Sequence, residues 1–138
     1  MADKTDSIKT KLAFDGEAEY KAACKELNSN LKLLGSEMKL VTAEYKNNAT
    51  STEALKAKQD VLKRTYDEQA KKVEETEKAL KAMKEAQGEN SDGAKRLETA
   101  LNQQKTALAN TKNALDDTDK ALEEAEKSAD DFGKEVED

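Results

Sequence analysis

Apolar positions between residues 20 and 45 recur at alternating intervals of four and three residues. This spacing places them on one face of an α-helix and is the heptad pattern of coiled coils. The pattern continues for more than three heptads and predicts a helix over residues 16–46. Its apolar positions are Tyr20, Cys24, Leu27, Leu31, Leu34, Met38, Val41 and Tyr45.

Two more runs with the same spacing follow. NNATS at 47–51 and GENSDG at 88–93 separate the three runs, and such residues favour turns and helix caps. We predict helices over residues 52–87 and 92–132, with Gly88 in a left-handed conformation after one helix and Ser91 or Asp92 capping the next. All these apolar positions together are called the heptad seam. Its members in the second and third runs are Leu55, Leu62, Tyr66, Val73, Leu80, Met83, Leu97, Leu101, Leu108, Leu115 and Leu122.

Polar side chains interrupt the seam at Gln59, Gln69, Gln104, Thr111 and Thr118. Polar residues at such positions lower stability but can set the register and the choice of partner. They can equally keep a weak assembly soluble and adaptable. The sequence leaves both interpretations open.

Residues 7–14, SIKTKLAF, alternate instead with a period of two, which predicts one short β-strand over residues 8–14. A single strand leaves its backbone groups unpaired, so it needs a partner from another chain or must stay frayed. Asp15 offers an N-cap for the first helix, with Glu17 and Glu19 in its first turn. We therefore divide the chain into an N-terminal arm, residues 1–15, and a helical region, residues 16–138.

The predicted fold class is all-α, with three long heptad-patterned helices that form antiparallel coiled-coil hairpins after the short strand. A lone helix of this kind buries too little apolar surface to remain ordered, so the helices must pair. Breaks of about five residues commonly join antiparallel helices. We also expect a homo-oligomer that depends on Leu27, Leu31 and Leu34.

Composition removes several classes of function. Residues 88–138 carry 14 acidic and 7 basic side chains, and such a segment would repel a phosphate backbone. We therefore expect no direct binding of nucleic acid. No apolar run approaches the roughly 18–20 residues that span a bilayer, and the first ten residues lack the apolar part of a secretory signal. A single cysteine excludes a disulfide within the chain.

The sequence also lacks a recognisable catalytic or metal-binding arrangement. There is no histidine to activate Cys24 as a nucleophile. The acids Asp116, Asp117 and Asp119 point in different directions around a helix. GENSDGAKRLET has neither the first nor the last carboxylate of a calcium-binding loop. We predict that the chain is not an enzyme and uses no metal and no cofactor.

One long stretch resembles a known family. LAFDGEAEYKAACKELNSNLKLLGSEMKLVTAEYKNNATSTEALKAKQDVL is similar to the N-terminal region of tail tape measure proteins of phages and prophages of Gram-positive bacteria. The similarity covers roughly residues 8 to 87. The marks that carry it are a short segment ending in DG, a helix beginning with EYK, the segment LLGSEMKLVTAEY, and STEALKAKQDVL at the start of the next helix.

The resemblance implies a structural role. Tape measure proteins are helical rods in the lumen of the tail tube that set tail length and assist tail assembly. They associate in several copies and with tail tube, tail tip and assembly chaperone proteins. The resemblance thus implies a place in the virion tail, and in the bacterial host cytoplasm during assembly. Family members run for many hundreds of residues with hydrophobic segments further on, so we interpret this chain as the N-terminal part of a longer protein. The alternative is a coiled-coil protein-binding adaptor or a chaperone-like module.

Overall fold

The chain folds into three long helices. The computed structural model describes residues 13–137, and the surroundings of their side chains through residue 130. In chain order the helices are α2 (Glu17–Glu44), α3 (Thr52–Gln87) and α4 (Asp92–Glu137). No strand occurs between residues 13 and 137. The prediction of three long helices is confirmed.

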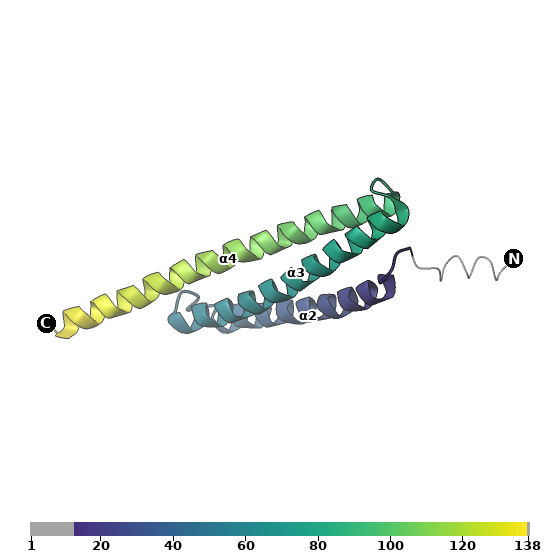
Figure 1. Cartoon of the computed structure of the whole chain (residues 1–138). Helices are drawn as coiled ribbons and strands as arrows, with labels where there is room; N and C mark the ends of the chain where they lie inside the picture. Colours follow the sequence, from purple (N-terminus) through teal and green to yellow (C-terminus); the bar gives the residue numbers. More distant parts are fainter. Residues whose placement is uncertain (1–12, 138) are drawn as a thin grey trace.

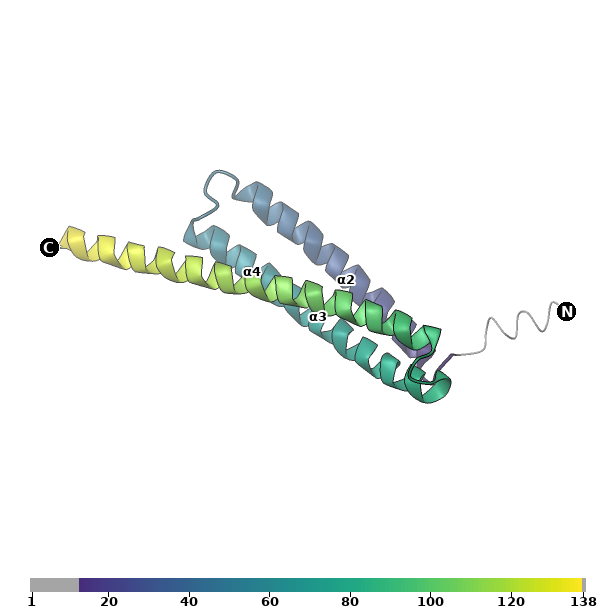
Figure 2. The same ribbon diagram turned by 90° about the horizontal axis from the view of Figure 1, so that it is seen from above.

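Consecutive helices run in opposite directions and lie side by side (Figures 1 and 2). Among the described residues α3 packs against both α2 and α4, whereas the backbones of α2 and α4 do not approach each other closely. The start of α2 lies near the turn between α3 and α4, and we call this end of the molecule the closed end. At the opposite end α4 continues past the turn that joins α2 to α3 (Figure 1).

Serine side chains cap the second and third helices. The Ser51 hydroxyl accepts a hydrogen bond from the backbone N–H of Ala54 at 3.2 Å, and Ser91 does the same for Ala94 at 3.1 Å. Each bond satisfies a backbone donor that the first helical turn leaves without a partner. Gly88 follows α3 with a φ of 101°, but its ψ of 153° is extended, so the predicted left-handed conformation is wrong in ψ.

The start of α2 differs from the prediction. Gly16, not Asp15, occupies the N-cap position, with a φ of 89° that a glycine adopts without a steric penalty. No side chain caps this helix end. Instead the Glu17 carboxylate reaches back and accepts a hydrogen bond from the backbone N–H of Ala13 at 2.8 Å. Glu17 and Glu19 lie in the first turn as expected.

The predicted strand can be compared with the structure only at residues 13 and 14, because residues 8–12 lie outside the described part of the chain. Its last two residues, Ala13 and Phe14, form a bend rather than a strand. Phe14 is buried in a cluster with side chains of α3 and α4. The apolar side chain that suggested an extended segment therefore packs against the closed end.

The end of α4 also differs from the prediction, which placed it at residue 132. The helix continues through Gly133 to Glu137. One glycine within a helix costs only about 1 kcal/mol relative to alanine, and the charged neighbours are good helix formers. At the end of α2, the helix stops at Glu44 rather than residue 46, a difference within the usual uncertainty of helix ends.

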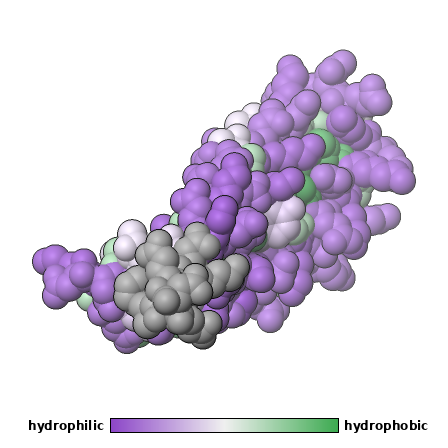
Figure 3. All heavy atoms as spheres, turned by 90° about the vertical axis from the view of Figure 1, so that its left-hand side faces the viewer, coloured by the Kyte–Doolittle hydropathy of each residue, from purple (hydrophilic) through white to green (hydrophobic). Residues whose placement is uncertain are grey.

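The surface of the rod is mainly hydrophilic, with a small hydrophobic patch on the face in Figure 3. Within residues 13–137, none of the helices combines the length and apolar character that a membrane crossing needs.

Candidate functional site

The heptad seam is the first candidate surface, and none of its predicted members is exposed. In α2 the buried members are Leu27 and Leu34, which α3 of the same chain covers. In this fold the surface that we assigned to self-association is therefore already occupied. The other buried members are Leu55, Leu62, Val73, Leu80, Met83, Leu101 and Leu122, and the half-buried ones are Tyr20, Cys24, Leu31, Met38, Val41, Tyr45, Tyr66, Leu97, Leu108 and Leu115.

Several buried residues were missed because α3 packs between two helices and needs a second apolar face. Ala54, Val61 and Ala79 of α3 are buried although they lie outside the predicted seam. The signal was present in the sequence, since Ala54 and Val61 are seven residues apart and Ala79 lies five helical turns further on. Ala94 at the start of α4 is fully buried as well.

The closed end holds an apolar cluster of buried side chains. Phe14, Leu80, Met83 and Leu101 belong to it, and Tyr20 packs against it with its ring centroid 6.3 Å from that of Phe14. The approach of α4 to α3 is so close here that a β-carbon on Gly93 would lie 2.6 Å from Cε of Met83. Any side chain at this position would therefore require the flexible end of Met83 to move.

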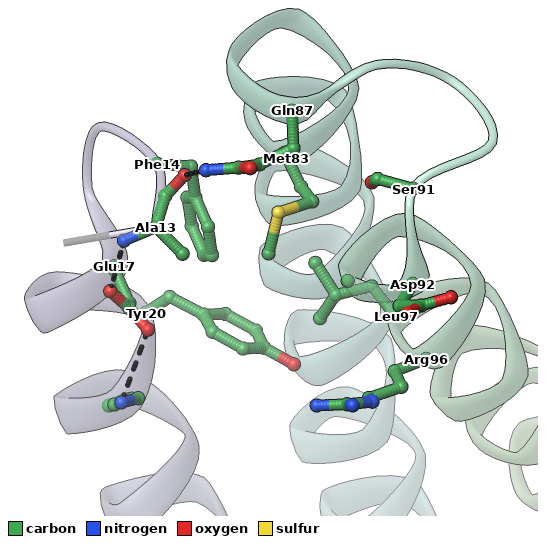
Figure 4. A pocket seen from close by; sticks show the side chains of 12 residues that line it. Ala13, Phe14, Glu17, Tyr20, Met83, Gln87, Ser91, Asp92, Arg96 and Leu97 are labelled. Atoms are coloured by element: carbon green, nitrogen blue, oxygen red, sulfur yellow. Dashed lines mark hydrogen bonds and ion pairs between the residues drawn. The ribbon is translucent and has the colours of Figure 1, made fainter. Parts of the chain in front are cut away.

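A pocket of about 570 Å³ opens beside this cluster (Figure 4). The Met83 side chain lies between Phe14 and Leu97 on its wall. At its rim the Gln87 side-chain amide donates a hydrogen bond to the backbone carbonyl of Ala13 at 3.0 Å. These contacts tie the segment before α2 to the end of α3.

Glu17 and Lys21 form an ion pair at this pocket. The pKa of Glu17 is lowered, chiefly because its carboxylate accepts a hydrogen bond from the Ala13 N–H. The Lys21 ammonium, 3.2 Å from the same carboxylate, lowers this pKa further. The Ser91 hydroxyl caps α4, and Asp92 and Arg96 also line the pocket. These groups can hold a small polar or mixed ligand, but they do not pair a nucleophile with a base. That the chain is not an enzyme stays a prediction.

Polar side chains inside the helix interfaces form a second feature. Thr76 is fully buried, and its hydroxyl lies 3.1 Å from the Tyr20 hydroxyl, which links α2 to α3. Burial raises the pKa of the Tyr20 phenol. The Thr118 hydroxyl donates to the carbonyl of Ala114 within its own helix, at 2.8 Å.

The predicted glutamines behave differently from one another. Gln59 donates to the Asp119 carboxylate at 2.6 Å and so joins α3 to α4. The side-chain carbonyl oxygens of Gln69 and Gln104 are buried and accept no hydrogen bond. Unpaired buried acceptors cost stability.

A third feature is an open groove of about 480 Å³ between α2 and the other helices. Lys21, Lys25 and Lys72 line it together with uncharged side chains, and no carboxylate does. Its charge is thus opposite to that of the whole chain, which is −6. In the described part of the chain, no three potential metal ligands of the His, Cys, Asp and Glu types come together.

No family model, curated protein or solved structure matches the chain.

Proposed function

We propose that this chain is the N-terminal part of a phage tail tape measure protein and acts as a folded anchor at one end of the rod. The proposal draws on the resemblance of residues 8 to 87 and on where its marks fall. EYK begins at Glu19 in the first turns of α2, and STEAL begins with the Ser51 cap of α3. These two marks thus coincide with helix starts, whereas LLGSEMKLVTAEY forms the second half of α2 and its C-cap.

The observation that carries the anchor role is the reversal of the chain at both turns. End to end, the three helices would extend about 165 Å, whereas α4 alone extends about 70 Å. A region that folds back on itself adds much less length per residue to a rod than the same helices would add end to end. We therefore assign length measurement to the rest of the parent protein and attachment to this end.

The finer features of the proposal follow from the heptad spacing for the hairpins, and from the family resemblance for the partners and the location. The two helix pairs, α2 with α3 and α3 with α4, are antiparallel coiled-coil hairpins. Copies of the chain associate with one another in the tail tube lumen and contact tail tube, tail tip and assembly chaperone proteins. The protein is made in the host cytoplasm and resides in the virion tail.

Removing Leu101 through Ala114 in the parent phage tests this role. Fourteen residues are two heptads, so the seam rejoins at Leu115 in the same register. An anchor predicts tails of unchanged length, measured by electron microscopy, that still contain the protein by mass spectrometry. Tails shorter by about 20 Å would instead show that this region lies extended and measures length.

The second candidate is a protein-binding adaptor or chaperone-like module, which the groove lined by Lys21, Lys25 and Lys72 favours. Cationic side chains without a carboxylate fit an acidic client peptide. An adaptor or chaperone acts before the tail is complete, so mass spectrometry of purified particles would not detect it. Detection of the chain in mature particles would favour the anchor.

A further inference from the structure

The outer face of α2 carries an apolar stripe that no part of the described chain covers. Leu33 and Leu40 are 63% and 58% exposed, unlike the neighbouring Leu34 at 6%. They are seven residues apart and therefore lie on one face of the helix. Exposed small residues alternate with them at heptad spacing, and we call the whole set the outer stripe: Ser29, Leu33, Ser36, Leu40 and Ala43.

The two flanks of the outer stripe carry opposite charge. One flank has a lysine at each heptad, namely Lys25, Lys32 and Lys39. The other has Glu37 and Glu44. If Leu33 and Leu40 are the core positions called a, the lysines occupy positions g and the glutamates positions e. Charges at e and g set the partner and the orientation of paired helices.

We propose that a second copy of this chain packs on the outer stripe with its α2 parallel and in register. In this arrangement Leu33 and Leu40 of the two copies face each other. In a parallel pair, a residue at position g faces the partner's position e whose residue number is higher by five. Lys32 therefore faces the partner's Glu37, and Lys39 faces the partner's Glu44. An antiparallel pair would instead place lysine against lysine and glutamate against glutamate, which is repulsive.

The rest of the fold leaves room for this contact. Leu27 and Leu34 are buried against α3, whereas Leu33 and Leu40 remain exposed, and Leu33 borders an open pocket beside Arg64 of α3. Arg64 of α3 holds the Glu37 carboxylate at 3.0 Å through one oxygen, which positions the acidic flank and leaves the other oxygen for a lysine. Small side chains at Ser29, Ser36 and Ala43 allow a close approach of the helices.

The interface is short and the association correspondingly weak. Glu26 occupies the next core position before the stripe, and a charge there ends the apolar contact. The stripe spans about two heptads with two leucines per copy, which is little apolar surface for a stable dimer. The inference rests on the self-association within the proposed function, and it names the surface on which that association occurs.

Sedimentation equilibrium over a concentration series tests the surface. The wild-type chain should dimerise reversibly, and Leu33→Ser with Leu40→Ser should raise the dissociation constant at least about tenfold. Both side chains are exposed, so the variant should keep its helix content by circular dichroism. A monomer at every concentration would overturn both the interface and the self-association. A dimer that the double variant leaves unchanged would overturn the outer stripe alone.

A disulfide test decides the orientation. In a Cys24→Ser background, Ser36→Cys places one thiol in each copy at the centre of the parallel contact, where the two thiols face each other. Mild oxidation should yield a covalent dimer on a non-reducing gel. The matched control is Asn28→Cys, another exposed position of α2 away from the stripe. Equal cross-linking at both positions, or none at Ser36→Cys, would contradict the parallel pair.

Exchanging the flank charges gives an independent check. The variant with Lys32→Glu, Lys39→Glu, Glu37→Lys and Glu44→Lys should still form a homodimer, because each pair remains opposite in sign. Mixed with wild type, it should form no heterodimer, because a parallel mixed pair brings like charges together. Preferential heterodimers would indicate antiparallel pairing and overturn the proposal.

Discussion

Replacing Leu34 by alanine removes one of only two buried side chains that α2 places against α3. Leu34 is 6% exposed and Leu27, one heptad earlier, is 7% exposed. Leu33 is adjacent in sequence but 63% exposed, so Leu33→Ala is a matched control with the same change in composition. The pair of variants therefore separates burial from helix propensity.

The structure sets the expected size of each effect. Leucine-to-alanine changes in protein cores cost about 2–5 kcal/mol. Only two helices meet at the interface of α2 with α3, so the side chains around the cavity can partly close it. We therefore expect Leu34→Ala to lower the free energy of unfolding by about 2–3 kcal/mol, near the low end of this range. Exposed substitutions usually remain within about 0.5 kcal/mol, and alanine has a slightly higher helix propensity than leucine. Leu33→Ala should therefore change the free energy of unfolding by less than about 0.5 kcal/mol.

Urea unfolding followed by circular dichroism at 222 nm measures both variants. The protein should be dilute, so that self-association through the outer stripe does not contribute to stability. A shift in the midpoint with an unchanged slope would indicate a loss of stability in a cooperative unit. Equal destabilisation by the two substitutions would refute the orientation of α2 on α3. No effect of Leu34→Ala would show that α2 is not docked.

Three further predictions concern the closed end and the polar seam. A double-mutant cycle of Tyr20→Phe and Thr76→Val, measured by urea unfolding, should give a coupling of about 0.5–1.5 kcal/mol, and strict additivity would exclude their hydrogen bond. The pKa of Glu17 is lowered from its ordinary value of 4.5, so ionised Glu17 stabilises the fold at pH values above 4.5. This stabilisation is lost as the pH falls through the folded-state pKa, and Glu17→Gln should therefore flatten the acid side of the plot of stability against pH. An identical profile would contradict the contact with the Ala13 N–H. Gly93→Ala should raise the melting temperature by less than a gain of about 1 kcal/mol in helix propensity predicts, because the end of the Met83 side chain must move; a lower melting temperature would show that Met83 cannot move aside.

Helix number and the starts of α3 and α4 were predictable because they depend on local chemistry. Ser51 and Ser91 cap the helices through bonds that reach only three residues along the chain. The heptad spacing likewise predicted side chains that the structure buries at least in part. Such features need no knowledge of distant segments.

The features that depended on three-dimensional packing were not predictable from the seam alone. The second apolar face of α3 exists because two helices contact it, and a pairwise heptad model has no place for Val61 or Ala79. Phe14 was assigned to a strand by its alternation, whereas the apolar cluster at the closed end determines its place. The seam also did not show that Leu27 and Leu34 would be covered within the chain, which leaves Leu33 and Leu40 exposed.

The central claim is that the chain folds back at both turns, since the anchor role depends on it. Spin labels at Asn28 of α2 and Lys71 of α3, in a Cys24→Ser background, report on this directly. Both side chains are exposed, and nearby the Asn30 amide donates to the Glu68 carboxylate at 3.2 Å across the same two helices. Dilution with unlabelled chain removes distances between copies.

Pulsed dipolar spectroscopy should then give a separation of about two helix diameters, roughly 20 Å. Helices placed end to end would separate the two labels by about 65 Å. A distribution centred near the longer distance would contradict the folded-back arrangement and, with it, the proposed anchor.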